Sequence, residues 1–291
     1  MYSLSLAQWS LHRTLLGVGP GDIDWAALEH DLRTDPTHAI RGRMDPLDFA
    51  RVARREYGIN AIEYVNTFYF GRASDRRYLR ELRSRAEGEG VRSLLIMCDF
   101  EGRPGDPNRE QAKKAVENHF KWVDAAECLG CKAIRVNVEG RGPEDQLLTF
   151  AVEDLRRLAE FSDPFGIDIL VENHGDLSSN GAWLAEVVRQ TNHPRVGTLP
   201  DFGNFRINDN ESYNNYKGME ELMPYAKAVS AKSYDFDGKG NETTLDYSRI
   251  MEIIAEAGYT GFIGVEYEGV RLSEPEGIRA TKALLERLSH V

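Results

Sequence analysis

Eight short, mostly apolar runs recur along the 291-residue chain, and most of them are followed by a longer amphipathic stretch. Runs that are apolar at nearly every position, rather than at alternate ones, are typical of parallel strands buried on both faces. The expected strands are 2–9, 59–66, 92–99, 132–138, 167–173, 195–201, 228–234 and 262–268. Eight strand–helix units in a chain of this length predict an α/β fold, the (β/α)8 TIM barrel.

The amphipathic stretches predict helices that end close to the next strand. The expected helices are 45–58, 75–90, 108–130, 144–166, 181–191, 247–259 and 277–289. Several of them close at a glycine (Gly58, Gly90, Gly130, Gly166 and Gly258), which tolerates the left-handed backbone of a helix C-terminus. No glycine-rich phosphate-binding turn follows any expected strand. Its absence favours a closed barrel over an open, doubly wound sheet.

One connection is unusually long. Residues 13–45 separate the first strand from the first amphipathic helix, and residues 22–32 within them could form a short helix. Connections of this length in compact domains often serve as lids or binding segments. No linker rich in Pro, Gly and Ser divides the chain, so residues 1–291 are expected to form a single domain.

Composition narrows the class of protein. The 47 acidic residues outnumber the 36 basic ones, for a formal charge of −11, which disfavours a nucleic-acid surface. No 18-residue apolar stretch or secretory signal is present, so we expect a cytoplasmic protein without membrane contact. Cys98, Cys128 and Cys131 lack the further ligand pair of a structural zinc site and are expected to be buried thiols. A homo-oligomer is compatible with the sequence, which does not determine the oligomeric state.

The chemistry of a TIM barrel lies at the carboxyl ends of its strands, and here most of these ends are polar. Carboxylates that meet in one small space repel each other unless they are protonated or joined by a cation. A divalent ion is one explanation, and an oxygen-rich site would suit Mn²⁺ or Mg²⁺ better than Zn²⁺. Ion pairs with arginine or lysine, or a shared proton, are the alternative. The residues concerned include Trp9, Asn66, Arg135, Glu172, His174, Asp201, Lys232 and Glu266.

Four segments resemble the sugar phosphate isomerase/epimerase family, whose members are xylose isomerase-like TIM barrels. They are "ILVENHGD", "GTLPDFGNF", "AVSAKSYDFDGKGNETTLDY" and "AGYTGFIGVEYEG". The resemblance implies that Glu172, Asp201 and Glu266 bind a divalent metal. It also implies that Glu172 and Glu266 form an acid/base pair. Ser230 stands where the family has a histidine ligand, two residues before Lys232. A hydroxyl binds such an ion less well than imidazole does, so metal binding is expected to be weaker here.

The reaction that the resemblance implies is metal-dependent isomerisation or epimerisation of a free sugar or cyclitol. A proton is removed from the carbon next to a carbonyl, and an enediolate forms. His174, Lys232, Arg135 and Asn66 would orient the substrate, while Trp9 would stack on a sugar face. His174 is also a candidate for the missing metal ligand, because it shares a strand face with Glu172.

Other functions remain open from the sequence. The same carboxylates suit a lyase or dehydratase that acts on a keto-sugar, a 3-keto-glycoside or a keto-cyclitol. A barrel that binds carbohydrate without catalysis, with a degenerate metal site, is a further alternative. An endonuclease for abasic DNA shares the fold, but it would need several zinc ions and several well-placed histidines, which the strand ends lack.

Overall fold

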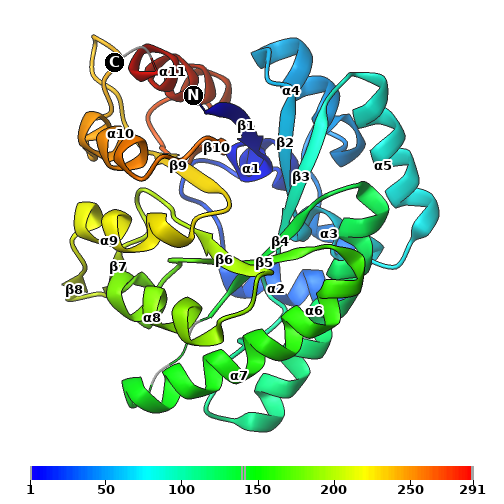
Figure 1. Ribbon diagram of the computed structural model, residues 1–291. Helices are drawn as coiled ribbons and strands as arrows, with labels where there is room; N and C mark the ends of the chain where they lie inside the picture. The colour runs from blue at the N-terminus through cyan, green and yellow to red at the C-terminus, as the bar shows by residue number, and fades with distance from the viewer. Residues whose placement is uncertain (1, 139, 141, 290–291) are drawn as a thin grey trace.

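The eight expected strands are all present in the computed structural model, which describes residues 2–138, 140 and 142–289. They run parallel in the order β6-β5-β4-β3-β2-β1-β10-β9, at the centre of Figure 1. Their bounds are β1 Ser3–Ala7, β2 Ala61–Val65, β3 Arg92–Met97, β4 Ala133–Asn137, β5 Asp168–Glu172, β6 Val196–Leu199, β9 Val229–Ser233 and β10 Phe262–Tyr267. The prediction of eight buried parallel strands is confirmed.

The ring closes between β6 and β9. Asp201, just beyond β6, forms a parallel bridge with Ser230 of β9. The Ser230 amide donates to the Pro200 carbonyl at 2.9 Å, and the Phe202 amide donates to the Ser230 carbonyl at 3.1 Å. The expected TIM barrel is therefore confirmed. Two residues that the sequence singled out, Asp201 and Ser230, lie side by side on its closing seam.

Helices surround the strands on the outside of the ring (Figure 1). Those predicted from the amphipathic pattern are α4 Phe49–Tyr57, α5 Arg76–Gly88, α6 Arg109–Leu129, α7 Glu144–Ser162, α8 Gly181–Thr191, α10 Tyr247–Glu256 and α11 Glu274–Leu288. The polar segment after β6 holds structure that the pattern did not predict. It forms a small hairpin, β7 Arg206–Asn208 with β8 Glu211–Ser212, followed by helix α9, Asn215–Leu222. Polar residues dominate there because the hairpin is largely exposed.

Glycine ends the helices as expected. Gly58 follows α4 with a φ of 68°, and Gly130 follows α6 with a φ of 79°. In both positions the glycine amide donates to carbonyls of the last helical turn. A side chain with a Cβ atom is disfavoured in this left-handed conformation. These two residues therefore set where each helix stops and the next strand begins.

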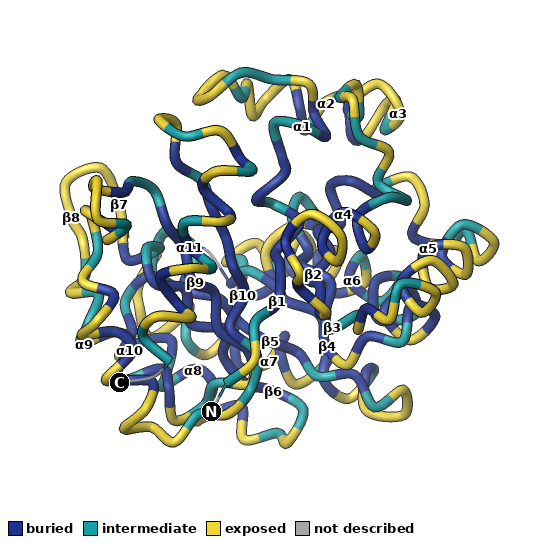
Figure 2. The backbone as a smooth tube through the Cα atoms, turned by 90° about the horizontal axis from the view of Figure 1, so that it is seen from above, coloured by how far each residue is buried: buried dark blue, intermediate teal, exposed yellow. Residues whose placement is uncertain are grey.

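The long connection after β1 folds over one end of the barrel. It contains α1 His12–Leu16, α2 Trp25–Thr34 and α3 Pro36–Ala39. The Asp24 side chain caps α2 by accepting a hydrogen bond from the Ala27 amide at 3.0 Å. In Figure 2 these helices lie at the end of the molecule opposite the two termini, and α2 and α3 have exposed outer surfaces. The short helix predicted within residues 22–32 is thus present.

The structure also bears on the three cysteines and on membrane-spanning helices. Cys98, Cys128 and Cys131 are buried free thiols, as the sequence predicts. Over the described part of the chain, no helix combines the length and the apolar character needed to cross a membrane.

A buried carboxyl group lies inside the strand ring. Glu63 of β2 accepts a hydrogen bond from the Ser5 hydroxyl at 2.5 Å, and its Oε2 has no hydrogen-bond partner among the described residues. A Cβ atom at Gly264 would approach the same carboxyl group to 2.7 Å, so the glycine leaves room for it. Burial raises the pKa of Glu63 to about 8, so the folded protein holds this proton at neutral pH.

Replacing Glu63 with glutamine should therefore change the pH dependence of stability. Between the usual glutamate pKa of about 4.3 and the folded value, the folded state binds one more proton than the unfolded state, so wild-type stability falls as pH rises. Glu63→Gln removes this pH-dependent contribution to stability. We expect equal melting temperatures near pH 5 and an advantage for the variant on the order of ten degrees at pH 8–9. A constant difference across this pH range would show that Glu63 is ionised in the folded protein.

Candidate active site

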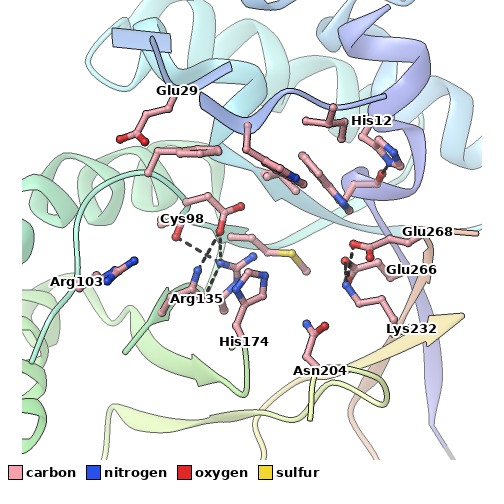
Figure 3. A pocket seen from close by; sticks show the side chains of 18 of the residues that line it. His12, Glu29, Cys98, Arg103, Arg135, His174, Asn204, Lys232, Glu266 and Glu268 are labelled. Carbon is pink, nitrogen blue, oxygen red and sulfur yellow. Dashed lines mark hydrogen bonds and ion pairs between the residues drawn. The ribbon is translucent and has the colours of Figure 1, made fainter. Parts of the chain in front are cut away.

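A cavity of 610 Å³ opens at the carboxyl ends of the strands. Part of its wall is polar and charged, and comes from strand ends and the loops that follow them. Another part is apolar and comes mainly from the β1–α4 connection and the loop after β3. Figure 3 shows the charged side chains directed toward the same space. The polar and charged lining includes Asp99, Arg135, Asn137, His174, Asn204, Lys232, Glu266 and Glu268.

Lys232 is the centre of one charged cluster. Its ammonium donates to Glu266 Oε1 and to Glu268 Oε1, each at 2.9 Å, and lies 3.7 Å from Asp201 Oδ2. Glu266 Oε2 accepts a hydrogen bond from the Ser230 hydroxyl at 2.7 Å. The parallel register brings this group together, because Glu266 of β10 pairs with Lys232 of β9. Figure 3 shows Lys232 linked to both glutamates at the cavity wall.

These contacts decide the charge state of the cluster. Burial would raise the pKa of Glu266, but the Lys232 charge and the hydrogen bonds from Lys232 and Ser230 lower the pKa below its ordinary value. Burial alone would also remove the charge of Lys232, yet the adjacent carboxylates hold the pKa of Lys232 well above its usual value. Glu266 is therefore an ionised carboxylate that faces the cavity beside an ammonium.

Arg135 is the centre of a second cluster. Its Nη1 donates to Asp99 Oδ1 at 2.6 Å, and its Nε lies 2.7 Å from Glu172 Oε2. Asn204 donates from Nδ2 to the other Glu172 oxygen at 3.1 Å. Nearby carboxylates outweigh the burial of Arg135 and raise the pKa of its guanidinium further. Arg135 and Asn204 line the cavity, whereas Glu172 is only 2% exposed and is absent from the lining.

Asp201 lies below the cavity with no exposed surface. Its Oδ1 accepts hydrogen bonds from the amides of Gly203 and Asn204 at 2.7 and 2.9 Å. Its Oδ2 has no hydrogen-bond partner among the described residues. Burial, reinforced by the nearby charges of Glu172 and Glu266 and only partly offset by Lys232, raises the pKa of Asp201 to about 7.

The expected metal ligands do not assemble into a binding site in this arrangement. Among residues 2–138, 140 and 142–289, no three His, Cys, Asp or Glu side chains are grouped so as to hold one ion. Both oxygens of Glu266 already accept hydrogen bonds, and Glu172 is paired with Arg135. The Lys232 ammonium contacts Glu266 and approaches Asp201, two of the three acids expected to share a metal. As they are arranged, Glu172 and Glu266 are engaged by cations, which the alternative of ion pairs describes.

The remaining predicted site residues divide into two groups. His174, Lys232, Arg135 and Trp9 line the cavity, where they can contact a ligand. Asn66 does not line it: its side chain donates to the Asp99 carbonyl at 2.9 Å and accepts from the Asp99 amide at 2.8 Å. Asn66 therefore joins the ends of β2 and β3, a role that a polar residue at a strand end does not reveal in the sequence.

Several cavity residues were not predicted, among them Asn204, Trp25 and Phe100. Asn204 follows the expected sixth strand in the "PDFGN" segment, a turn in which Asp201 accepts two amide hydrogen bonds. Trp25 and Phe100 are large apolar residues in connections outside the strands. Their position in such connections was the sequence feature that could have identified them as cavity residues. Asp99 and Glu268 stood at expected strand ends but had no assigned role.

Comparisons with known proteins agree with this architecture. A family model described as the xylose isomerase-like TIM barrel matches residues 51–288. An uncharacterised protein of Methanocaldococcus jannaschii is 25% identical over 81% of this chain and 83% of its own length. A putative hydroxypyruvate isomerase of Danio rerio is 25% identical over 72% of this chain and 79% of its own. A C-glycoside deglycosidase alpha subunit of Arthrobacter globiformis is 41% identical, but only over 49 residues, 17% of this chain and 14% of its own.

Solved structures share the fold at low sequence identity. An L-ribulose 3-epimerase aligns with a TM-score of 0.68 at 13% identity, over 100% of this chain and 95% of its own. A D-tagatose 3-epimerase-like protein aligns with a TM-score of 0.67 at 20% identity, over 99% of this chain and 97% of its own. The IolI protein, described with a bound zinc atom, aligns with a TM-score of 0.65 at 13% identity, over 98% of this chain and 97% of its own.

Proposed function

This chain belongs to the xylose isomerase-like TIM barrel family, and from that premise we propose that it is an enzyme that moves a proton next to the carbonyl of a sugar or cyclitol. The observation that carries the proposal is Glu266, an ionised carboxylate at the cavity wall beside Lys232. The family relatives named as sugar isomerases and epimerases support the same class of reaction.

Glu266 acts as the base. It removes a proton from the carbon adjacent to the substrate carbonyl, and negative charge develops on the carbonyl oxygen. Lys232 and Arg135, both at the cavity wall, are the cations available to stabilise that charge. Preorganised positive groups at such an oxygen are a major source of rate enhancement in enzymes. His174 and Asn204 line the same space and orient hydroxyl groups.

The position of Glu172 favours isomerisation over epimerisation. One base suffices to carry the carbon-bound proton to the adjacent carbon on the same face while the hydroxyl proton passes between the two neighbouring oxygens, whereas epimerisation requires a second group on the opposite face. Glu172 was expected to be that group, but it lies behind Arg135 and Asn204 and outside the cavity lining. In this proposal Glu172 orients Arg135 through their ion pair.

The proposed mechanism uses no divalent metal. The resemblance predicts Mn²⁺ or Mg²⁺, and the zinc atom of the IolI structure supports a metal within this fold. In this chain Lys232 and Arg135 supply positive charge among the same carboxylates, and Ser230 donates its hydroxyl proton to Glu266.

A lyase is the second candidate. Removal of the same proton by Glu266 in a 3-keto-glycoside, followed by breakage of the bond to the aglycone, would release the aglycone and leave an unsaturated keto-sugar. The local similarity to a C-glycoside deglycosidase alpha subunit favours this candidate, over the 49 residues that it covers.

Solvent isotope exchange tests the proposal directly. Purified protein is incubated in D₂O with hydroxypyruvate, D-fructose, D-tagatose, D-psicose and a 3-keto-glucoside, before and after dialysis against EDTA. We expect deuterium at the carbon next to the carbonyl of at least one compound, at a rate above that of heat-inactivated protein and unchanged by EDTA. No exchange with any of them would overturn the proposal. Exchange lost with EDTA and restored by Mn²⁺ would instead establish the metal-dependent mechanism.

A further inference from the structure

The outer part of the cavity has an aromatic wall that proton transfer does not require. Trp9 and Trp25 stack with their ring centroids 5.8 Å apart and their planes at 20°. Phe100 continues the wall, with its centroid 6.5 Å from that of Trp25. All three residues line the same cavity as Glu266 and Lys232. The site therefore combines a charged end and an aromatic end in one space.

The aromatic end is exposed to an unusual degree. Trp25 is 54% exposed and Val270 is 60% exposed, and both line the cavity. Among the described residues, the other exposed large hydrophobic residue is Phe165, which lies at the end of α7 and away from the site. Exposed apolar side chains grouped at a cavity mouth indicate a binding surface, because their burial by a ligand is favourable.

The wall is held in place by its neighbours. Phe100 has a φ of 61°, a left-handed conformation that is uncommon for a residue with a side chain and costs on the order of 1–3 kcal/mol. Its carbonyl accepts a hydrogen bond from Arg33 Nη2 of α2 at 2.9 Å. This contact ties the loop after β3 to the helix that carries Trp25. The two elements that form the wall are thus joined to each other.

We propose that the ligand is a glycoside whose planar, apolar aglycone lies on Trp25 and Phe100, while its sugar lies at Lys232 and Glu266. This inference rests on the proposed function for the position of the sugar, whose ring would carry the carbonyl as in the 3-keto-glycoside of the second candidate. The cavity volume of 610 Å³ falls within the range of about 300–1,000 Å³ that is typical of sites for drug-sized ligands. A free hexose would leave the aromatic end unfilled.

The chemistry of the wall favours an aryl group over a second sugar. Ile23 and Val270 also line the cavity and offer only hydrocarbon surface. A second sugar would find hydrogen-bond partners only where its hydroxyl groups reach Glu29 or Arg103, because the apolar side chains of the wall offer none. A planar aromatic ring stacks on tryptophan and phenylalanine without needing such partners. Glu29 and Arg103 also line the cavity and are drawn in Figure 3 on the side away from Lys232 and Glu266.

Calorimetric binding of unreactive glycosides tests the proposal. Phenyl β-D-glucopyranoside is expected to bind at least tenfold more tightly than methyl β-D-glucopyranoside. Trp25→Ala should weaken phenyl glucoside binding by about tenfold and leave methyl glucoside binding unchanged. Trp25→Phe should retain most of the preference, and Phe165→Ala, which removes an exposed aromatic side chain away from the cavity, should retain all of it. Circular dichroism and melting temperature check the fold of each variant.

Three results would overturn the aglycone subsite: equal or undetectable binding of both glucosides, a phenyl preference that survives Trp25→Ala, or tighter binding of cellobiose than of the phenyl glucoside. These measurements involve no turnover. The isotope exchange described above therefore separates the two proposals. Phenyl-selective binding without isotope exchange would overturn the proposed reaction and support the aglycone subsite. Isotope exchange without phenyl selectivity would support the proposed reaction and overturn the aglycone subsite.

Discussion

Glu266→Gln is expected to lower the rate of solvent isotope exchange by about 10²–10⁴-fold, the usual contribution of a general base. Glutamine retains the size of the side chain and can still accept a hydrogen bond from Lys232 or Ser230, but it cannot take a proton from carbon. The loss should therefore appear in kcat, with a smaller change in KM. Exchange into the active keto-compound in D₂O, followed by NMR, measures both.

Two further variants serve as controls for the Glu266→Gln result. Glu256→Gln alters an exposed residue of α10 and should leave exchange unchanged. Glu172→Gln should reduce exchange by a smaller factor, because the neutral amide weakens the ion pair that orients Arg135 but leaves the base in place. Wild-type exchange in Glu266→Gln together with none in Glu172→Gln would contradict our assignment and make Glu172 the base.

Lys232→Met should reduce exchange by about 10²–10³-fold, comparable to the removal of one preorganised donor at a developing oxyanion. It should also destabilise the fold by about 3–5 kcal/mol, because Glu266 and Asp201 would remain buried without their shared cation. Methionine fills a similar volume without charge, so the packing changes little. Exchange rates and urea unfolding measure the two effects.

Adding a second substitution to Lys232→Met separates the effect of charge on stability from the effect of packing. In Lys232→Met/Glu266→Gln one buried negative charge is removed along with the positive one, so part of the lost stability should return while exchange falls further because the base is also lost. Full exchange in folded Lys232→Met would exclude Lys232 from the proposed mechanism. If the single variant does not fold, recovery of folding in the double variant still tests the electrostatic role of Lys232.

Hydrophobic pattern and helix-ending glycines contain most of the information about the fold. The eight apolar runs correspond to β1–β6, β9 and β10, and glycines such as Gly58 and Gly130 lie where the helices stop. These features are local, because burial on both faces and a left-handed φ act on a few consecutive residues. The hairpin β7–β8 and helix α9 were not predicted because most of their residues are polar, although Met219 and Leu222 of α9 are buried.

The positions of the apolar runs already show which charged residues stand at the strand ends, since parallel strands in a barrel all deliver their carboxyl ends to one side. How those charges pair depends on the folded chain. Glu172 joins Arg135 of the neighbouring strand, while Glu266 and Asp201 approach Lys232 rather than a common point suited to an ion. Folding also brings Trp25 and Phe100 together from distant segments. Pairing depends on distances of a few ångströms between side chains from different strands and loops, and no pattern along the chain encodes those distances.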